Sequence, residues 1–376
     1  MKVSCLQENL ARGLNTVARA VAPRSTLPVL GNILLATDNG RLRLSATNLE
    51  LGITCWIGGK VEEDGSTTVP ARTFVDLVNT LPNDRVDMEL AVRTQTLSVR
   101  SKTFNNELKC IDAQEFPPLP PADLEGDLTL DVSDLREMIS QVVFAASSDD
   151  ARPVLTGVLC EVNDGELSMA AADGFRLSVR SSHLPSPGVG PLRAIIPSRA
   201  LSELARTVGD DDTVTLSLPP NRGQVIFRTE NVELVSQLIE GTYPDVKGII
   251  PNGYQTRTVL PTSSFLKACK AADIFAREAA HSARLVITPG SELEPGTLEI
   301  SATAAETGSN ETVVDATIEG EPAEIAFNVR FLIDVLSVVE TPNVALETSN
   351  ANAPGVIRSV GRDDFLHVIM PMHLGR

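Results

Sequence analysis

The chain has 376 residues, which is long for one hydrophobic core and sufficient for two or three domains. Hydrophobic residues make up 42% of it and charged residues 22%, as is ordinary for a globular protein. The net charge of -17 argues against a general nucleic-acid binder, because such proteins neutralise phosphates with Lys and Arg. Any contact with DNA would therefore need a local basic surface on an acidic body.

Cysteine usage and hydropathy indicate the compartment. The five cysteines are odd in number, far apart and never arranged as CxxC, which argues against a disulfide framework or a zinc site and favours a reducing compartment. The opening residues MKVSCLQENLARG lack the apolar stretch of a signal peptide, and no apolar run approaches the ~20 residues of a membrane helix. We therefore expect a soluble, cytoplasmic protein with no metal and no cofactor.

The first predicted element is an amphipathic helix, ENLARGLNTVARAV, that starts at Glu8. A turn glycine, Gly40, then opens an alternating strand, GRLRLSAT, and a second amphipathic helix, ARTFVDLV, starts at Ala71. Arg12 and Arg19 are seven residues apart. Because seven residues make two helical turns, we expect both arginines on one face of the first helix.

The same three elements recur twice further along the chain. The strands GELSMAAA and GTLEISAT begin at Gly165 and Gly296, which lie 125 and 131 residues after the preceding turn glycine. The helices of the later copies read SDLREMISQVVFAA, SRALSELA, SSFLKACKAADIFA and VRFLIDVL, and they start at Ser133, Ser198, Ser263 and Val329. We expect Ser133 and Ser263 to be N-caps.

This repeat predicts an α+β protein of three tandem homologous domains, residues 1–122, 123–253 and 254–376. Joints that contain proline or glycine, at residues 116–127 and 249–258, separate the domains. A single irregular α+β domain is the alternative, but it leaves three matching elements at three places to chance. Whole domains in tandem, longer than the ~20–50 residues of a solenoid unit, point to an arc or a ring.

Basic residues recur at helical spacing in the three copies. Arg199 and Arg206, and likewise Lys270 and Arg277, repeat the seven-residue spacing of the first helix. If the helices line one side of an arc, these residues form a concave basic surface that suits phosphate contact without base readout. An ordinary solvated helix face is the other reading, and recurrence in three helices disfavours it.

Five segments carry the motifs of a known family. They are STLPVLGNILL from Ser25, VPAR from Val69, AADGFRLSV from Ala171, EGTYPDVKGIIP from Glu240 and VIMPMHL from Val368. These segments resemble the bacterial beta sliding clamp, the beta subunit of DNA polymerase III, across all three repeats and in order. The resemblance implies a head-to-tail dimer whose six DNA-clamp domains close into a ring around duplex DNA, with helices lining the hole and sheets outside.

The resemblance also implies a peptide-docking groove between the second and third repeats. An apolar pocket that contains methionines can repack around several different peptides. Without the family, a final core strand is the other reading of the near-terminal VIMPM run. The matching positions are Leu155, Ala172, Gly174, Phe175, Arg176, Leu177, Pro244, Ile249, Val368, Ile369, Met370, Pro371 and Met372.

For DNA, the resemblance carries over Arg24 most directly, in a loop that would face the duplex. The full set of predicted DNA-contacting residues is Arg12, Arg19, Arg24, Arg72, Arg152, Arg199, Arg206 and Lys270. The residues predicted at the dimer surface are Phe104, Leu108, Ala280 and His281.

The predicted function is that of a processivity factor in the nucleoid, which tethers the catalytic subunit of the replicative polymerase to DNA. The implied partners are double-stranded DNA, a clamp loader complex, other polymerases, ligase and mismatch-repair proteins that carry linear motifs. No membrane partner is expected. The chain lacks the GxxxxGK[ST] motif, so the ATPase that opens the ring must reside in another protein.

An enzyme and a peptide-docking adaptor are the alternatives to a clamp. An enzyme is disfavoured because no two histidines have metal-ligand spacing and no GxSxG or cysteine-nucleophile signature occurs. A peptide-docking adaptor of the same fold, which does not stably encircle DNA, is the stronger alternative. It shares the groove with the clamp but not the ring.

Overall fold

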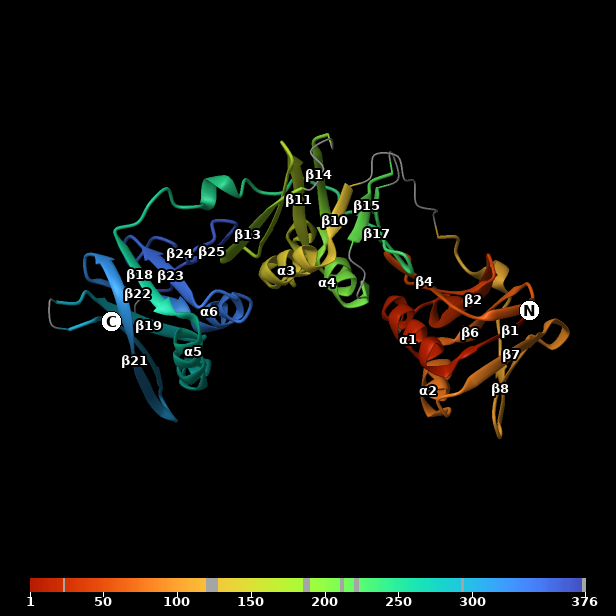
Figure 1. Cartoon of the computed structure of the whole chain (residues 1–376). Coiled ribbons are helices and arrows are strands. Elements are labelled where there is room, and N and C mark those ends of the chain that lie inside the picture. Colours follow the sequence, from red (N-terminus) through yellow and green to blue (C-terminus); the bar gives the residue numbers. More distant parts are fainter. Residues whose placement is uncertain are drawn as a thin grey trace. The chain divides into compact units, whose positions relative to one another are not determined.

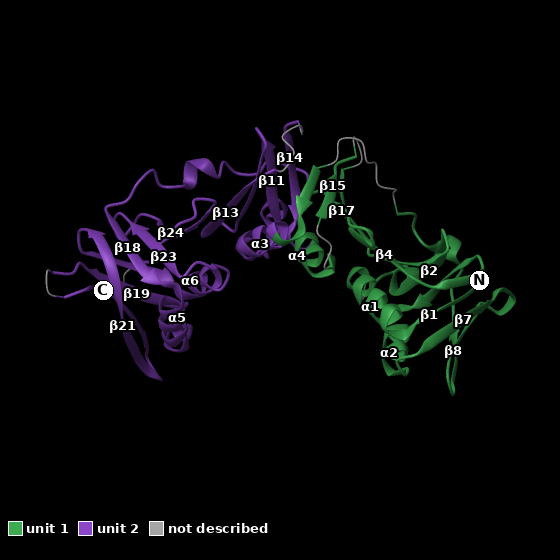
Figure 2. Cartoon of the chain, in the orientation of Figure 1, with its two compact units in different colours: residues 1–133, 200–238 green, residues 134–199, 239–376 purple. Residues whose placement is uncertain are grey.

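The computed structural model describes residues 1–22, 24–119, 128–184, 190–209, 213–219, 223–291 and 294–373. The chain divides into two compact units, residues 1–133 with 200–238 and residues 134–199 with 239–376 (Figure 2). The central third of the chain therefore contributes to both units. The predicted boundary at residues 122 and 123 lies outside the described residues, and none of the described helices is long and apolar enough to cross a membrane.

The first unit contains an eight-stranded and a five-stranded antiparallel sheet (Figure 1). The larger, of order β10-β15-β16-β17-β4-β3-β2-β6, comprises β2 (Asn32–Asp38), β3 (Arg41–Thr47), β4 (Leu51–Ile57), β6 (Ser66–Pro70), β10 (Leu128–Asp131), β15 (Thr213–Ser217), β16 (Gln224–Arg228) and β17 (Val232–Gln237). The smaller, of order β5-β1-β7-β8-β9, comprises β1 (Lys2–Leu6), β5 (Lys60–Glu63), β7 (Arg85–Ala91), β8 (Thr96–Ser101) and β9 (Phe104–Lys109). The helices are α1 (Gln7–Val17), α2 (Ala71–Thr80) and most of α4 (Ser198–Thr207).

Helix α1 shows how the apolar pattern becomes a core. Leu10, Leu14 and Val17 are fully buried at helical spacing, and the helix packs on β3 and β4 beside α2 (Figure 1). Gly13 permits this close approach, because a Cβ atom there would lie 2.7 Å from Cδ1 of Leu44. Arg12 stays exposed on the same helix. One face of the helix thus belongs to the core and the other carries charge.

The second unit is built on a twelve-stranded sheet of order β14-β11-β12-β13-β25-β24-β23-β18-β21-β20-β19-β22. Its first four strands are β11 (Gly157–Asn163), β12 (Glu166–Ala172), β13 (Arg176–His183) and β14 (Leu192–Pro197). The others are β18 (Thr256–Pro261), β19 (Ser282–Thr288), β20 (Gly296–Ala304), β21 (Gly308–Gly320), β22 (Ala323–Asn328), β23 (Asn343–Thr348), β24 (Gly355–Ser359) and β25 (Phe365–Ile369). Its helices are α3 (Val132–Val142), α5 (Thr262–Ala276) and α6 (Val329–Leu336).

Equivalent backbone hydrogen bonds confirm the predicted threefold repeat. A segment after the last strand of each copy bonds back to the strand before its second helix: Ile111 N–H to Thr68 O at 3.2 Å, Ile239 to Ile195 at 2.9 Å, and Met372 to Ala326 at 2.8 Å. The six predicted helices and the three predicted strands are present. The joints between copies also match, because Gln237 N–H bonds Glu50 O at 2.8 Å and Met370 N–H bonds Phe175 O at 2.8 Å.

Both predicted N-caps are wrong by two residues. Helix α3 begins at Val132, and Asp131 accepts hydrogen bonds from the backbone and the hydroxyl of Ser133. Helix α5 begins at Thr262 after Pro261, which has no side-chain cap, so Ser263 lies inside the helix. The first helix is also shorter than predicted, since α1 ends at Val17 and a 3-10 turn follows. Asp131 and the strand-ending Pro261 thus stand at the helix starts that serine was expected to set.

A buried ion cluster ties β13 to α3 and to the turn before β25. The side chain of Arg180 is only 3% exposed and contacts Asp364 at 2.6 Å and Asp134 and Glu137 at 3.5 Å. Arg362 completes the cluster with Glu137 at 2.7 Å and Asp364 at 2.9 Å. Three acids thus surround one buried guanidinium, and removing that guanidinium would leave them facing each other.

We expect Arg180→Met to destabilise the second unit by about 2–4 kcal/mol, because it leaves three carboxylates without their shared partner. The matched control is Arg193→Met, whose exposed pair with Glu161 at 3.3 Å contributes about 1 kcal/mol or less. Urea unfolding followed by far-UV circular dichroism measures both. Equal shifts in the two variants would contradict the assignment.

Candidate functional site

Nine buried apolar residues form one cluster, the docking cluster, where β13 pairs with β25. The pairing runs from Arg176 opposite Ile369 to Arg180 opposite Phe365, with Leu177 opposite Val368. The members of the docking cluster are Leu159, Ala170, Ala172, Leu177, Ile195, Tyr243, Val246, Val356 and Val368. Val154, Leu155, Val179, Ile239, Ile250 and Leu366 pack against it with partial exposure. Strands from the second and third repeats therefore share one apolar core.

Three large apolar side chains remain exposed among the residues predicted for docking, and we call them the docking rim. Phe175 is 61% exposed, Met370 42% and Ile249 40%. The bond from Met370 N–H to Phe175 O, at 2.8 Å, holds two of them together. Exposed apolar residues beside a closed apolar cluster are typical of a surface that binds another protein.

The turn between β12 and β13 presents Phe175 outward. One oxygen of the Asp173 carboxylate accepts hydrogen bonds from the backbone N–H of Phe175 at 2.8 Å and of Arg176 at 3.0 Å. Gly174 has φ +94°, a conformation that residues with a Cβ atom rarely adopt. The Asp-Gly pair therefore fixes the turn by side-chain capping and by conformational freedom together.

Tyr243 anchors the segment that follows β17. Its side chain is buried, and its hydroxyl accepts from Ala172 N–H at 3.0 Å and donates to Gly157 O at 3.4 Å. Burial raises the pKa of this phenol to about 12, so it remains a neutral donor. Pro244, the next residue, is exposed.

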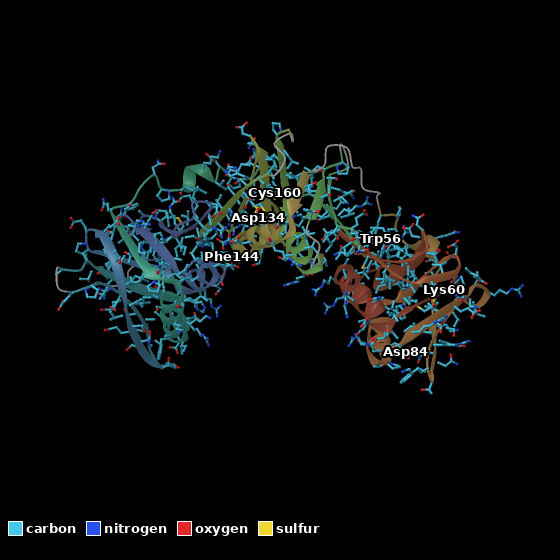
Figure 3. All side chains as sticks on the ribbon, viewed as in Figure 1. Trp56, Lys60, Asp84, Asp134, Phe144 and Cys160 are labelled. Carbon is cyan, nitrogen blue, oxygen red and sulfur yellow. The ribbon has the colours of Figure 1, made fainter. Side chains whose placement is uncertain are left out.

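Arg176 points into the protein rather than toward a ligand. Its side chain is 10% exposed and bonds Asp173 at 3.0 Å, Phe144 O at 2.6 Å and Asp334 of α6 at 2.5 Å. The guanidinium also lies over the Phe144 and Phe331 rings, 5.4 and 4.4 Å from their centroids (Figure 3 labels Phe144). Its contacts join the docking turn to a helix of the third repeat.

The structure brings most, but not all, of the predicted docking residues together. Ala172, Leu177 and Val368 are buried in the docking cluster, while Leu155 packs against it. Ile369 belongs instead to the separate core of the third repeat, because successive residues of a strand face opposite sides. Gly174 is exposed, and Pro371 and Met372 are half-buried beyond the end of β25.

The predicted DNA-contacting residues are all at the surface, with different electrostatic surroundings. Glu203 pairs with Arg19 at 3.2 Å and with Arg206 at 3.1 Å, and Arg152 pairs with Asp149 at 3.2 Å. The side chain of Arg72 is 96% exposed. Arg12, Arg24, Arg199 and Lys270 are exposed, and no ion pair forms at them within the described part of the chain.

The prediction that Arg12 and Arg19 share one face of the first helix is wrong, because α1 ends at Val17, between them. Arg19 lies in the 3-10 turn of residues 18–20, so the two-turn spacing does not apply to it. The same holds for Lys270 and Arg277, since Arg277 follows the end of α5. Arg199 and Arg206 do share α4.

The predicted dimer residues are only partly exposed. Phe104 is 43% exposed on β9, whereas Leu108 is 8% exposed and packs inward. Ala280 and His281 form a left-handed turn after α5, where the His281 ring bonds Asp273 at 2.8 Å. Ile274, which was not among the predicted dimer residues, is 59% exposed on α5, off the buried stripe of the helix.

Comparisons with known proteins match the chain along its length. Models of the N-terminal, central and C-terminal domains of the DNA polymerase III beta subunit match residues 1–120, 129–245 and 247–373. A beta sliding clamp of Synechococcus elongatus is 34% identical over all of both chains, and one of Bacillus subtilis is 29% identical over 99% of both.

The chain belongs to the beta sliding clamp family. Two crystal structures of the family superpose on all of this chain. A sliding clamp from Bacillus subtilis has a TM-score of 0.93 at 28% identity, and one from Pseudomonas aeruginosa, bound to griselimycin, has a TM-score of 0.91 at 31% identity. Three tandem clamp domains are therefore the fold of this chain.

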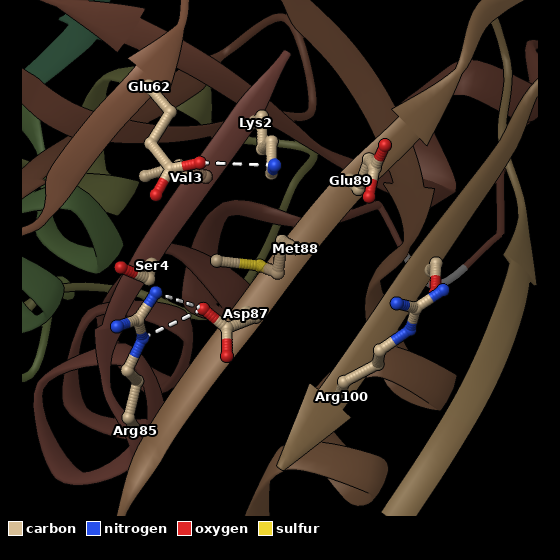
Figure 4. Close-up of a pocket in the computed structure, with 10 residues that line it drawn as sticks. Lys2, Val3, Ser4, Glu62, Arg85, Asp87, Met88, Glu89 and Arg100 are labelled. Atoms are coloured by element: carbon tan, nitrogen blue, oxygen red, sulfur yellow. Dashed lines mark hydrogen bonds and ion pairs between the residues drawn. The ribbon is translucent and has the colours of Figure 1, made fainter.

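A polar pocket of about 250 Å³ lies on the five-stranded sheet of this clamp chain (Figure 4). Four of its charges are paired: Lys2 contacts Glu62 at 3.2 Å and Arg85 contacts Asp87 at 2.6 Å. Exposed pairs of this kind are typical of a solvated sheet face and contribute little free energy. No cluster of metal-ligating side chains occurs among the described residues.

His367 lies next to Val368 on β25 and faces the side of the sheet opposite to the docking cluster. It is fully buried on β25, its Nδ1 is 2.6 Å from Oγ of Ser178, and the Phe144 ring centroid is 5.3 Å from its own. Burial, reinforced by the positive charge of Arg176, lowers the pKa of this imidazole from 6.5 to about 3. The ring is therefore neutral in the folded chain at neutral pH.

We expect this histidine to make the second unit acid-sensitive. Between pH 3 and 6.5 the unfolded chain binds the proton and the folded chain does not, so stability falls by about 1.4 kcal/mol per pH unit below pH 6.5. Urea unfolding at pH 7.5, 6.0 and 5.0 measures the slope. His367→Leu should flatten it, whereas His183→Leu, at an exposed position, should leave it intact. Identical slopes in all three proteins would refute the role of His367.

Proposed function

We propose that this chain is a processivity factor: two copies close head to tail around duplex DNA and hold polymerases on it through the docking cluster and rim. The observation that carries the proposal is the exposed rim of Phe175, Ile249 and Met370 over a closed apolar cluster, in a chain that aligns end to end with sliding clamps. The proposed role needs no catalytic group, because the clamp acts by lengthening the time that a polymerase stays on DNA.

Retention by a closed ring is topological, so strong DNA affinity is unnecessary. Tight phosphate contacts would slow sliding, and weak non-specific ones suffice. Arg24 and Arg199 are exposed and form no ion pair among the described residues, and Arg72 has only a long contact with Asp76 at 3.9 Å, so we assign these three the phosphate contacts. We assign further phosphate contacts to Arg12 and Lys270. Weaker ones are assigned to three arginines with acidic neighbours: Arg152, Arg19 and Arg206. The net charge of -17 keeps other surfaces away from DNA.

The partners follow from the rim and from the missing ATPase motif. Short apolar peptides of the polymerase catalytic subunit, other polymerases, ligase and mismatch-repair proteins would insert between Phe175 and Met370. A separate clamp loader would open the ring. The dimer contact would use Phe104 and Ile274, which are among the exposed apolar residues of the first and third repeats. We also propose domain boundaries at residues 122/123 and 253/254.

A peptide-docking adaptor that never encircles DNA is the second candidate. It would use the same rim, but it leaves the exposed arginines on the helices of successive repeats without a purpose. The full-length similarity to sliding clamps favours the ring.

The docking assignment predicts that Phe175→Ala and Met370→Ala each weaken peptide binding. Truncating an apolar side chain at a binding surface costs about 1–3 kcal/mol, so the Kd should rise roughly 5- to 150-fold. Titration of a fluorescent polymerase-tail peptide measures it. Val92→Ala, 63% exposed but far along the chain in the first repeat, is the matched control. An unchanged Kd in both rim variants would remove the assignment.

The ring predicts retention that depends on DNA topology. Loaded onto a nicked circle, the clamp should stay bound in high salt and run off once the circle is cut, because retention needs no ion pairs. Gel filtration of labelled clamp on both DNA forms measures this, and light scattering gives the dimer mass. A monomer with equal retention on both forms would support the adaptor instead. Phe104→Arg should lower the dimer fraction.

A further inference from the structure

A second pocket, of about 450 Å³, lies on the eight-stranded sheet of the first unit. It opens on the face opposite α1, since Leu42 and Leu44 of β3 point to the helix and Arg43 to the pocket. Residues 116–119, near the end of the first repeat, form one wall, and β16 and β17 form another. Its volume falls within the range of ligand-binding pockets.

One side of this pocket is apolar and packs closely against the sheet. Trp56 of β4, labelled in Figure 3, lines it with Phe116, Pro118 and Leu119. Leu119 packs directly on β4, because a Cβ atom at Gly52 would lie 2.7 Å from its Cδ2. The absence of a side chain at Gly52 thus lets the wall approach the sheet.

The other side carries one cation with an unfilled donor. Asp38 accepts a hydrogen bond from the Trp56 indole at 2.7 Å, and Glu233 pairs with Arg228 at 2.5 Å. The buried Nε of Arg43 has no hydrogen-bond partner among the described residues. Because the Arg43 side chain forms no ion pair among the described residues, a ligand carboxylate would supply an acceptor that the protein does not offer this guanidinium.

The internal repeat supplies a comparison within the same chain. The second-repeat counterparts of Leu34, Ser45 and Thr54, each 125 residues on, are Leu159, Ala170 and Val179. Those three pack in or against the docking cluster, with Leu366 where the first unit has Glu233. Ser168 replaces Arg43. The pocket and its arginine therefore distinguish the first repeat and are not a by-product of the fold.

We propose that this pocket is a second ligand site, separate from the docking cluster, which binds an apolar group that carries a carboxylate. The apolar group lies against Trp56, Phe116 and Leu119, and the carboxylate accepts from the Arg43 guanidinium. Charge-assisted bonds to guanidinium are among the stronger contacts available to a carboxylate. A free aromatic acid and an acidic side chain beside an apolar one in a peptide both satisfy this chemistry.

Trp56 lines this pocket and is the one tryptophan in the chain, so its emission reports on binding there. Titration with 4-phenylbutyrate should change its emission saturably, and the neutral 4-phenylbutanamide should bind about tenfold or more weakly. Arg43→Gln should abolish the preference for the acid. Arg41→Gln is the matched control, since Arg41 lies two residues away, stacks on Trp56 at 5.8 Å and does not line the pocket.

A second titration, with the blocked dipeptide acetyl-Phe-Asp-amide, distinguishes a peptide from a free acid as the source of the carboxylate. Tighter binding of the dipeptide assigns the site to peptides, and tighter binding of 4-phenylbutyrate assigns it to free acids. Phe175→Ala should leave either response intact, so a failed docking assignment would not affect this one. No saturable response, equal response to the neutral amide, or equal loss in both arginine variants overturns the proposal.

Discussion

The antiparallel pairing of β13 with β25 is the constraint on which the candidate site depends. Its register sets Leu177 opposite Val368 and brings the second and third repeats into one sheet. Backbone hydrogen bonds define this joint, so the docking cluster closes wherever apolar residues occupy the inward positions. The ion cluster around Arg180 and the contacts of Arg176 then fasten helices α3 and α6 to the same strands. Packing, charge and register all converge on one seam.

Much of the fold could be predicted, because periodicity records which face of an element is buried. Leu201 and Leu204 of α4 and Leu332 and Val335 of α6 are buried as their spacing indicates. The turn glycines Gly40 and Gly165 both have φ +78°. Helix starts were less predictable, since Asp131 and Pro261 compete with the neighbouring serines for the cap position.

The site was predicted less well, because exposure is a tertiary property. Nothing local distinguishes Arg176, held between two rings, from an arginine that reaches solvent. Ile369 and Val368 differ only in the side of the strand that they occupy, and that side depends on the register with β13. Phe104 and Leu108 lie on the same side of β9, four residues apart, yet only Leu108 is buried. The partners that decide these questions are Asp334, 158 residues from Arg176, and Leu177, 191 residues from Val368, and no short motif records them.

The two joints between repeats end in the same backbone bond but carry different side chains. Gln237 meets Glu50 at the first joint, and Met370 meets Phe175 at the second. The hydrogen bond uses main-chain atoms in both cases, so it is indifferent to what projects outward. Main-chain atoms therefore join the repeats, whereas side chains at the same positions would set the binding preference of the proposed clamp. The choice of partner can therefore drift between related clamps, or be redesigned, while the joint that holds the domains keeps its geometry.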